Sequence, residues 1–259
     1  MRTCNSYIIT IAFLCLVIVF LLMSCKKEKH DPGPYGYWNV PDGGTAVIEN
    51  TSLSGKGLLT NRANTTWIIR GDVTVDDLSA IGRVIVAEGA TLHVNGLINV
   101  AGGAHLTLQG QTFCTTLTQV GHVFFNEAQV HVSGQYTLAG GTSTYLQNSL
   151  VEVQDLRLQG AVYGLENEHT QATNIYSVFY IHGSNPYLNR AAGTTVCGQV
   201  LLTYSNDQGS SGIALNDHTS TAIAAKPELR AIYDLPSDIL FYRYADQGCT
   251  AVATAPSPF

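Results

Sequence analysis

The sequence predicts an all-β protein in which short strands stack into a solenoid. Three observations support this class: an internal repeat of strand length, apolar residues at every second position within each copy, and glycine at the ends of most copies. Four segments align without gaps, residues 89–96, 103–110, 127–134 and 141–148. Copies this short hold one strand each and can bury their apolar side chains only by stacking on neighbouring copies.

Alternation within each copy predicts which side chains face the interior. Successive strand side chains point to opposite faces, so Ala90, Leu92 and Val94 in the first copy should line one core. The equivalent positions in the next two copies are Ala104, Leu106 and Leu108, and Ala128, Val130 and Val132. The intervening positions, including His93, His105 and His131, should face outward. Glycine at the ends lets the chain turn tight corners.

The phrase Gly89-Ala90-Thr91-Leu92-His93-Val94 and its repeats resemble the coils of single-stranded parallel β-helix (β-solenoid) proteins, which include pectate-lyase-like enzymes and many adhesin passenger domains. The resemblance covers about residues 65–160 and implies a fold but no particular activity. An antiparallel β-sandwich of the same strands is the alternative. We expect an N-terminal cap over 35–64, solenoid repeats over 65–160, and irregular coils with a C-terminal cap over 161–259. Residues 227–235 are predicted to contain a short helix.

The first 25 residues predict an export signal. Arg2 precedes an uncharged, mostly apolar run over 7–23, which is short for a bilayer span but suits a signal peptide. Its end, Leu22-Met23-Ser24-Cys25, resembles the bacterial lipobox. That resemblance implies a lipoprotein signal peptide over 1–24, cleavage after Ser24 and lipidation of Cys25, whereas an uncleaved membrane anchor is the alternative. Residues 25–34 then form a tether. Lys26 is compatible with export of the lipid-anchored chain to the outer membrane of the cell envelope, and the charged tether also fits a surface-exposed position.

Three cysteines remain after the signal peptide and Cys25 are set aside: Cys114, Cys197 and Cys249. At most one disulfide can form within the chain, and Cys197 with Cys249 is the favoured pair because both lie in the C-terminal part. Cys114 sits in an apolar run and should be buried. The spacing matches no zinc site.

The number and position of charged residues limit which partners and which catalytic residues the chain can have. The chain has a formal net charge of −6, which speaks against a nucleic-acid partner, and its 45% hydrophobic content excludes disorder as the main state. Residues 89–151 contain one charged residue, Glu127, so a catalytic pair would have to use acids on the flanks. The candidates are Asp76, Asp77, Glu152 and Asp155.

Each flank also has a structural alternative. Asp76 and Asp77 resemble the paired aspartates of polygalacturonase-like enzymes, but the partner motifs are missing, and two aspartates that turn a corner before Leu78 are the favoured explanation. Glu152 and Asp155, with Arg157, could form an outward ion pair, or bind calcium together with Glu166 and Glu168.

The outward faces suit binding more than catalysis. Their hydroxyl, amide and imidazole groups fit a neutral glycan or an envelope protein, with Tyr145, Tyr176, Tyr180 and Tyr187 as candidate aromatic contacts unless some of these pack the C-terminal cap. No cofactor is predicted. His93 and His131 share a repeat position and could bind zinc or copper, but a solvated polar face is favoured. We therefore expect a non-catalytic, surface-facing outer-membrane lipoprotein for binding, adhesion or envelope structure, held to the membrane by its lipid anchor. The alternatives are a polysaccharide lyase or hydrolase with its site on the flanks, and a self-associating structural solenoid.

Overall fold

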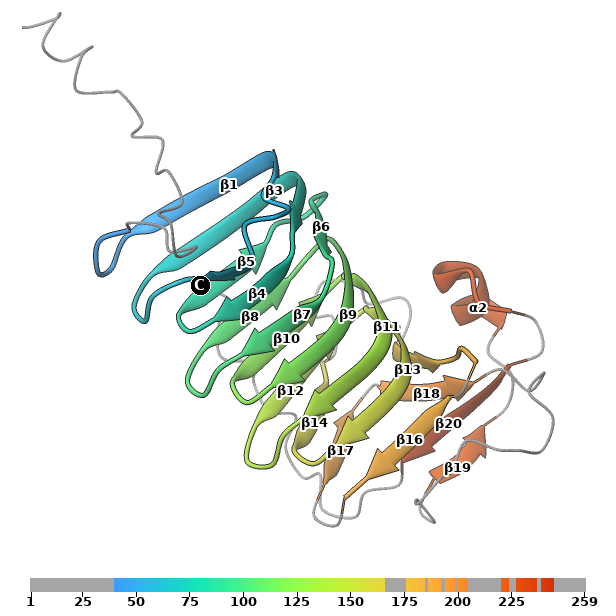
Figure 1. Cartoon of the computed structure of the whole chain (residues 1–259). Helices are drawn as coiled ribbons and strands as arrows, with labels where there is room; N and C mark the ends of the chain where they lie inside the picture. The colour runs from blue at the N-terminus through green and yellow to red at the C-terminus, as the bar shows by residue number, and fades with distance from the viewer. Residues whose placement is uncertain are drawn as a thin grey trace, which may run out of the picture. The chain divides into compact units, whose positions relative to one another are not determined.

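Short strands follow one another from Thr45 onward in the computed structural model (Figure 1). The structure describes residues 40–165, 176–184, 186–191, 194–198, 200–204, 220–223, 227–236 and 239–244. All of these belong to one compact unit, residues 32–259. The other unit, residues 1–31, lies outside the described residues, and with it the predicted signal peptide, Cys25 and most of the tether.

The strands lie in three rows, and each full coil of the chain contributes to each row in turn. We name the rows faces A, B and C. Face A consists of the first halves of β1 (Thr45–Ser52) and β3 (Thr66–Val75), followed by β5 (Arg83–Val86), β8 (His105–Leu108), β10 (His122–Asn126), β12 (Ser143–Gln147), β14 (Ala161–Gly164) and β17 (Thr195–Gly198).

Face B continues from the ends of β1 and β3. It consists further of β6 (Thr91–Val94), the first halves of β9 (Gln111–Gln119), β11 (Gln129–Leu138) and β13 (Leu150–Leu158), then β15 (Ser177–Ile181) and β18 (Val200–Tyr204). Face C consists of β2 (Leu58–Thr60), β4 (Asp77–Ala80), β7 (Leu97–Val100), the second halves of β9, β11 and β13, and β16 (Tyr187–Arg190).

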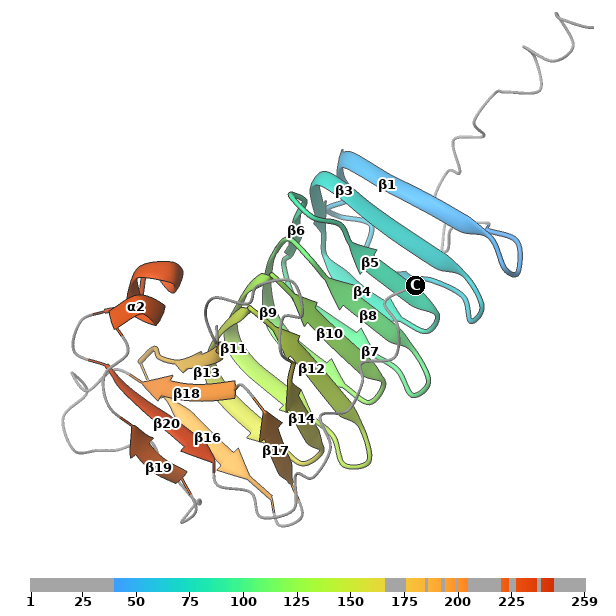
Figure 2. The ribbon, with the colours of Figure 1, turned by 180° about the vertical axis from the view of Figure 1, so that it is seen from behind.

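Every pairing along these three rows is parallel, and the coils make a β-solenoid of about 7 turns (Figures 1 and 2). The predicted parallel β-helix is therefore confirmed and the antiparallel sandwich is excluded. One copy of the sequence repeat, however, does not correspond to one full coil of the solenoid. Copies 89–96 and 127–134 lie on face B, in β6 and β11, whereas copies 103–110 and 141–148 lie on face A, in β8 and β12.

The predicted interior positions are buried. Leu92, Leu106 and Val130 are each at most 2% exposed, and the register stacks like on like, for example Val84 beside Leu106 and Leu106 beside Val123 on face A. Each coil thus closes the core of the previous one, which is how units too small to fold alone become stable together.

A polar network fills the core where coils four to six meet. The side chains of Gln119, Tyr136 and Thr144 are completely buried. Gln119 Oε1 accepts hydrogen bonds from the Tyr136 hydroxyl at 2.6 Å and from Thr144 Oγ1 at 2.7 Å, while Gln119 Nε2 donates to the carbonyl oxygens of Gly121 and Ser143. Burial raises the pKa of the Tyr136 phenol, so this hydroxyl stays protonated and acts as a donor. The network is satisfied throughout, which removes most of the cost of burying polar groups.

Glycine occupies the corners, as predicted, for two different reasons. Gly103 has φ +78°, a left-handed conformation that favours glycine. Gly160 has no such torsion, but a Cβ there would lie 2.5 Å from the carbonyl oxygen of Thr142 and 2.7 Å from that of Ala139. Any side chain at position 160 is excluded because the preceding coil approaches too closely.

The parallel stack begins earlier than the predicted boundary at residue 65. Strands β1 and β2 lie within the segment expected to be a cap, yet they pair with β3 and β4 in the same parallel sense as the later coils. Ala46, Ile48 and Leu59 are buried and continue the interior rows. The Gly-, Asn- and Thr-rich composition of this stretch differs from that of the later repeats, but the stretch forms the same kind of coil.

The C-terminal part ends the stack in a different way. β20 (Leu240–Tyr244) pairs antiparallel with both β18 and β19 (Ser220–Ile223). The predicted short helix is present as α2 (Pro227–Tyr233), and its Leu229 and Tyr233 pack in a cluster with the outward Val178 and Leu201 of face B. β15 is consequently buried on both sides. Within the described part of the chain, no helix has the length and apolar character required to span a membrane.

Candidate functional site

One outward row of face B gathers imidazole, aromatic and carboxylate side chains. The strand register aligns these residues coil by coil: Thr74, His93, Phe113, His131, Glu152 and Tyr180. They lie on β3, β6, β9, β11 and β13, which follow one another in the sheet (Figure 1), and on β15, which pairs with β13. The expectation that His93 and His131 share a face is confirmed, with Phe113 between them: its ring stacks on His93 at 4.8 Å and lies 6.2 Å from the ring of His131.

His131, Glu152 and His182 form the densest set of potential ligands in the described chain. His131 Nδ1 lies 3.0 Å from Glu152 Oε2, and one ligand atom from each of the three residues lies within 4.8 Å of the other two. His182 directly follows β15, and its backbone N–H donates to the carbonyl oxygen of Val153 at 2.9 Å. All three side chains are partly exposed, so the cluster is open to solvent.

The environment of His182 favours its neutral form. Burial is the main cause lowering the pKa of its imidazole, the nearby Glu152 carboxylate opposes that effect, and His131 adds to it. A neutral imidazole keeps a nitrogen lone pair, which is the form that binds metal ions.

Tyr180 supports this cluster from the side of the C-terminal cap. Its ring stacks on His182 at 4.4 Å with an angle of 20° between the planes, and the residue is only 8% exposed. Tyr176 packs against the same apolar cluster, and its carbonyl oxygen accepts a hydrogen bond from the Tyr233 hydroxyl at 3.0 Å. These two tyrosines therefore contribute to packing around α2, Tyr180 as a buried residue and Tyr176 as a partly buried one.

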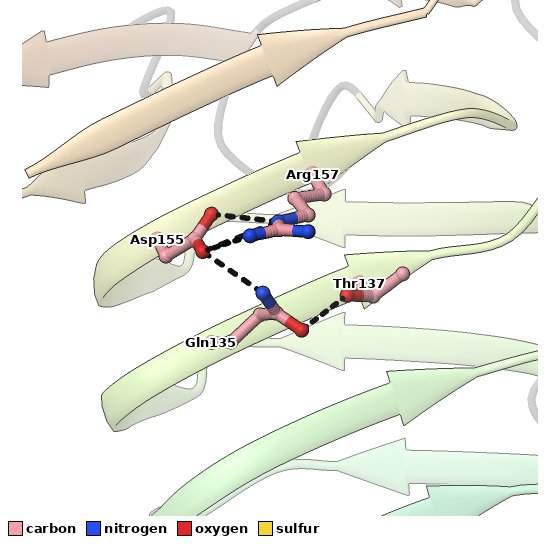
Figure 3. Close-up of polar contacts among 4 residues, drawn as sticks. All are labelled: Gln135, Thr137, Asp155 and Arg157. Atoms are coloured by element: carbon pink, nitrogen blue, oxygen red, sulfur yellow. Dashed lines mark hydrogen bonds and ion pairs between the residues drawn. The ribbon is translucent and has the colours of Figure 1, made fainter.

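The predicted acidic cluster around residue 155 is divided by a corner of the solenoid. Glu152 lies on face B, whereas Asp155 and Arg157 lie on face C. Figure 3 shows the face C network: Arg157 Nη2 donates to Asp155 Oδ2 at 2.8 Å, and Gln135 Nε2 on the preceding coil donates to the same oxygen at 2.8 Å. The Asp155 carboxylate raises the pKa of Arg157. Glu166 and Glu168, the other proposed calcium ligands, lie outside the described residues.

Tyr187 belongs to this third face. It pairs with Asp155 in the register, and the Arg157 guanidinium carbon lies 5.6 Å from the centre of its ring. The four tyrosines predicted as binding residues thus occupy three faces, with Tyr145 on face A, Tyr176 and Tyr180 beside α2, and Tyr187 on face C.

Asp76 and Asp77 lie at the corner between faces B and C and bind the backbone of neighbouring coils. Asp76 Oδ2 accepts from the Gly57 N–H at 2.9 Å, and Asp77 Oδ1 accepts from the Leu97 N–H at 2.6 Å. The Gly57 hydrogen bond is the main cause lowering the pKa of Asp76. These contacts are those expected of aspartates that fix a corner.

Face A carries a neutral surface over four coils. Its outward residues there are His105, Thr107, Gln109, His122, Phe124, Asn126, Ser143, Tyr145, Gln147, Ala161 and Tyr163. The rings of Tyr145 and Tyr163 stack at 5.4 Å, and Phe124 lies 6.4 Å from Tyr145. Tyr145 and Tyr163 are partly exposed, whereas Phe124 is only 9% exposed.

The cysteines divide by environment. Cys114 is free and 5% exposed, as predicted, and burial raises the pKa of its thiol to about 12, which makes it unreactive. Cys197 is disulfide-bonded. Cys249 and Cys25 lie outside the described residues.

Sequence reasoning found His131 and Glu152 but did not bring them together, and it did not single out His182. Their juxtaposition depends on coil length: from Gln129 in β11 to Leu150 in β13 the chain advances one coil, and the register places Glu152 beside His131. Outward parity was the available signal for His131, whereas His182 follows a strand of five buried residues that shows no alternation.

Fold and surface together define a class, the three-faced parallel β-solenoids with a C-terminal cap. No protein-family model, curated protein or solved structure matches this chain.

Proposed function

We propose that this chain is a surface-facing, lipid-anchored outer-membrane protein whose solenoid binds a neutral glycan without catalysis. The observation that carries the proposal is the uncharged outward surface of face A over β8, β10, β12 and β14. Rows of hydroxyl, amide and imidazole groups repeat there at the strand spacing of about 4.8 Å. Such rows suit an extended chain of neutral sugars, whose hydroxyls need many donors and acceptors at regular intervals.

The lowered pKa of His105 supports this surface. The rings of His105 and His122 stack at 5.2 Å on face A. Burial is the main cause lowering the pKa of His105, and the nearby His122 and Arg83 add to the effect. A neutral imidazole both donates and accepts hydrogen bonds, as a sugar hydroxyl requires.

The positions of the flank acids weigh against the hydrolase or lyase alternative. Asp76 and Asp77 hold backbone N–H groups at a corner, and Asp155 holds Arg157 and Gln135 on face C. Glu152 lies on another face from Asp155. Glycoside hydrolysis by two carboxyls needs the pair to flank one bond at a fixed separation.

The C-terminal end weighs against the self-associating alternative. β20 runs antiparallel along β18 and occupies the edge that a further parallel coil of face B would use. Covering an edge in this way is how sheets avoid pairing with another chain.

Binding is tested on the full chain, purified in detergent, against a panel of neutral oligosaccharides with product analysis alongside. Replacing Tyr145 and Tyr163 together by alanine should weaken binding at least about tenfold. Replacing Thr116 and Thr118, which lie outward on face C, should leave it unchanged and serves as the control. Absence of binding to every glycan, or release of new reducing ends or unsaturated products by the wild type, would overturn the proposal.

The anchor is tested separately. The Cys25→Ala variant should lose incorporation of labelled fatty acid and leave the outer-membrane fraction, because the lipobox-like sequence supplies the acylated thiol. Two or more acyl chains give firm anchoring, where one would be marginal. Labelling and fractionation identical to the wild type would show that residues 1–24 act as something other than a lipoprotein signal peptide.

A further inference from the structure

We propose that His131, Glu152 and His182 bind one Zn²⁺ ion on face B. This site is independent of the glycan surface on face A, because it uses other strands and other residues. Two imidazoles and one carboxylate are a donor set that zinc takes in proteins when a fourth position stays open to water or another ligand.

The geometry requires little rearrangement. Zinc bonds of about 2.0–2.1 Å in a tetrahedral arrangement place ligand atoms about 3.3 Å apart. His131 Nδ1 and Glu152 Oε2 are already 3.0 Å apart, and all three ligand atoms lie within 4.8 Å of one another. The remaining contraction is within reach of side-chain rotation, since the side chains of His131 and Glu152 are 38% and 31% exposed.

The backbone beneath the site is fixed by the sheet. His131 and Glu152 are register partners on β11 and β13, and Tyr180 on β15 is the register partner of Glu152. The His182 N–H binds Val153 O, which ties the third ligand to the strand that carries Glu152. Two ligands on adjacent strands and a third directly after the next strand are positioned before the ion arrives, and this reduces the entropic cost of binding.

Aromatic rings hold the two imidazoles. Tyr180 stacks on His182 at 4.4 Å, and Tyr180 is itself fixed in the apolar cluster beside α2. Phe113 lies 6.2 Å from His131, and the two imidazole rings are 6.0 Å apart. These contacts restrict both rings near the carboxylate and leave the outward side open for the fourth ligand.

The competing explanation is an ordinary hydrogen-bonded His131–Glu152 pair with His182 as a packing neighbour. The two explanations differ in what His182 does. A simple pair needs only His131 and Glu152, whereas a zinc site needs all three side chains and binds one ion per chain.

The test titrates Zn²⁺ into the metal-free full chain in detergent against a chromogenic chelator, with Co²⁺ as a spectroscopic probe. We expect one ion per chain, visible absorption of a tetrahedral Co²⁺ complex, and a higher Tm with Zn²⁺. His182→Gln and Glu152→Gln should each weaken binding at least about tenfold. His93→Gln, on the same outward row but outside the cluster, should bind Zn²⁺ as the wild type does.

Two results would overturn the site. One is Zn²⁺ binding no tighter in the wild type than in the triple variant with His131, Glu152 and His182 all replaced by glutamine. The other is wild-type affinity in His182→Gln, which would leave only a His131–Glu152 pair. Thermal melts of each variant without metal show whether it is folded, and the triple variant is compared with His93→Gln on the same basis.

Discussion

The Tyr136 hydroxyl donates to Gln119 Oε1 at 2.6 Å, and both side chains are completely buried inside the solenoid. Gln119 lies on β9 and Tyr136 on β11, so this bond joins two coils through the core as well as through the sheet. Thr144 on β12 donates its hydroxyl to the same Gln119 oxygen, and its Oγ1 lies 3.0 Å from the Tyr136 hydroxyl oxygen. A polar bond at this depth makes the fit between coils specific as well as tight.

Tyr136→Phe should therefore destabilise the fold by about 1–3 kcal/mol, because Gln119 Oε1 loses one buried donor. Chemical denaturation of the full chain in detergent measures the change. Tyr145→Phe is the matched control, since Tyr145 is partly exposed on face A and its hydroxyl can be replaced by water. Equal midpoints for wild type and Tyr136→Phe would mean that the buried bond contributes nothing net.

Leu106→Asp should destabilise the protein by at least about 3 kcal/mol, because it buries an unpaired charge where Leu106 is 1% exposed. Thr107→Asp, one residue further along β8 and facing outward, should change stability by less than about 1 kcal/mol. Thermal melts of both variants give the comparison. A similar loss in the two would contradict the assignment of inward and outward positions.

Gly160→Ala should cost about 1–3 kcal/mol, since the added Cβ meets carbonyl oxygens of the preceding coil. Gly102→Ala is the control at a comparable corner: the nearest atom to its Cβ is Val120 Cγ1 at 3.9 Å, and no positive φ is required. Denaturation midpoints should fall for the first variant and stay near the wild type for the second. A larger loss for Gly102→Ala than for Gly160→Ala would show that the space at the corner does not decide whether a side chain is tolerated there.

Acidification should weaken the fold partly through His105. Its pKa in the folded protein is lowered from 6.5, first by burial and then by His122 and Arg83. The unfolded chain therefore takes up a proton more readily, and stability present above about pH 6.5 is lost as the pH falls below it. Tm measured from about pH 7.5 to about pH 5.5 should fall less steeply for His105→Gln than for the wild type. If Tm falls equally with pH in both proteins, His105 does not contribute to the acid sensitivity.

The fold could be predicted from the sequence because parity and corners are local properties. Alternation predicts that Leu92, Leu106 and Val130 face inward whatever the length of a coil, and glycine marks the corners. Contacts between residues one coil apart could not be predicted, because they depend on the number of residues in each coil. The distance along the chain from β11 to β13 decides that His131 meets Glu152, and from there to β15 that both meet His182. Neither the alternation of apolar residues nor any motif indicates how many residues make up one coil.

The aromatic residues show the same limit. Tyr145, Tyr176, Tyr180 and Tyr187 look alike in the sequence, yet one stacks on Tyr163 on a neutral face, two pack beside α2, and one lies under Arg157. Their environments depend on which face each coil presents and on where the C-terminal helix settles. Predicting these requires the register of the whole stack.

The antiparallel β20 has a consequence for how the protein is made. From β3 onward, each strand of the three rows pairs with a strand synthesised one coil earlier, so a chain emerging from its N-terminus finds each partner already in place. Coils can then be added in order, each using the previous one as its template. On face B the outer edge of the last coil stays exposed until β20, which follows β18 in the chain, pairs with it. A chain that ends before residue 240 therefore lacks the strand that covers β18, and this is the state in which the solenoid is most exposed to pairing with the wrong strand.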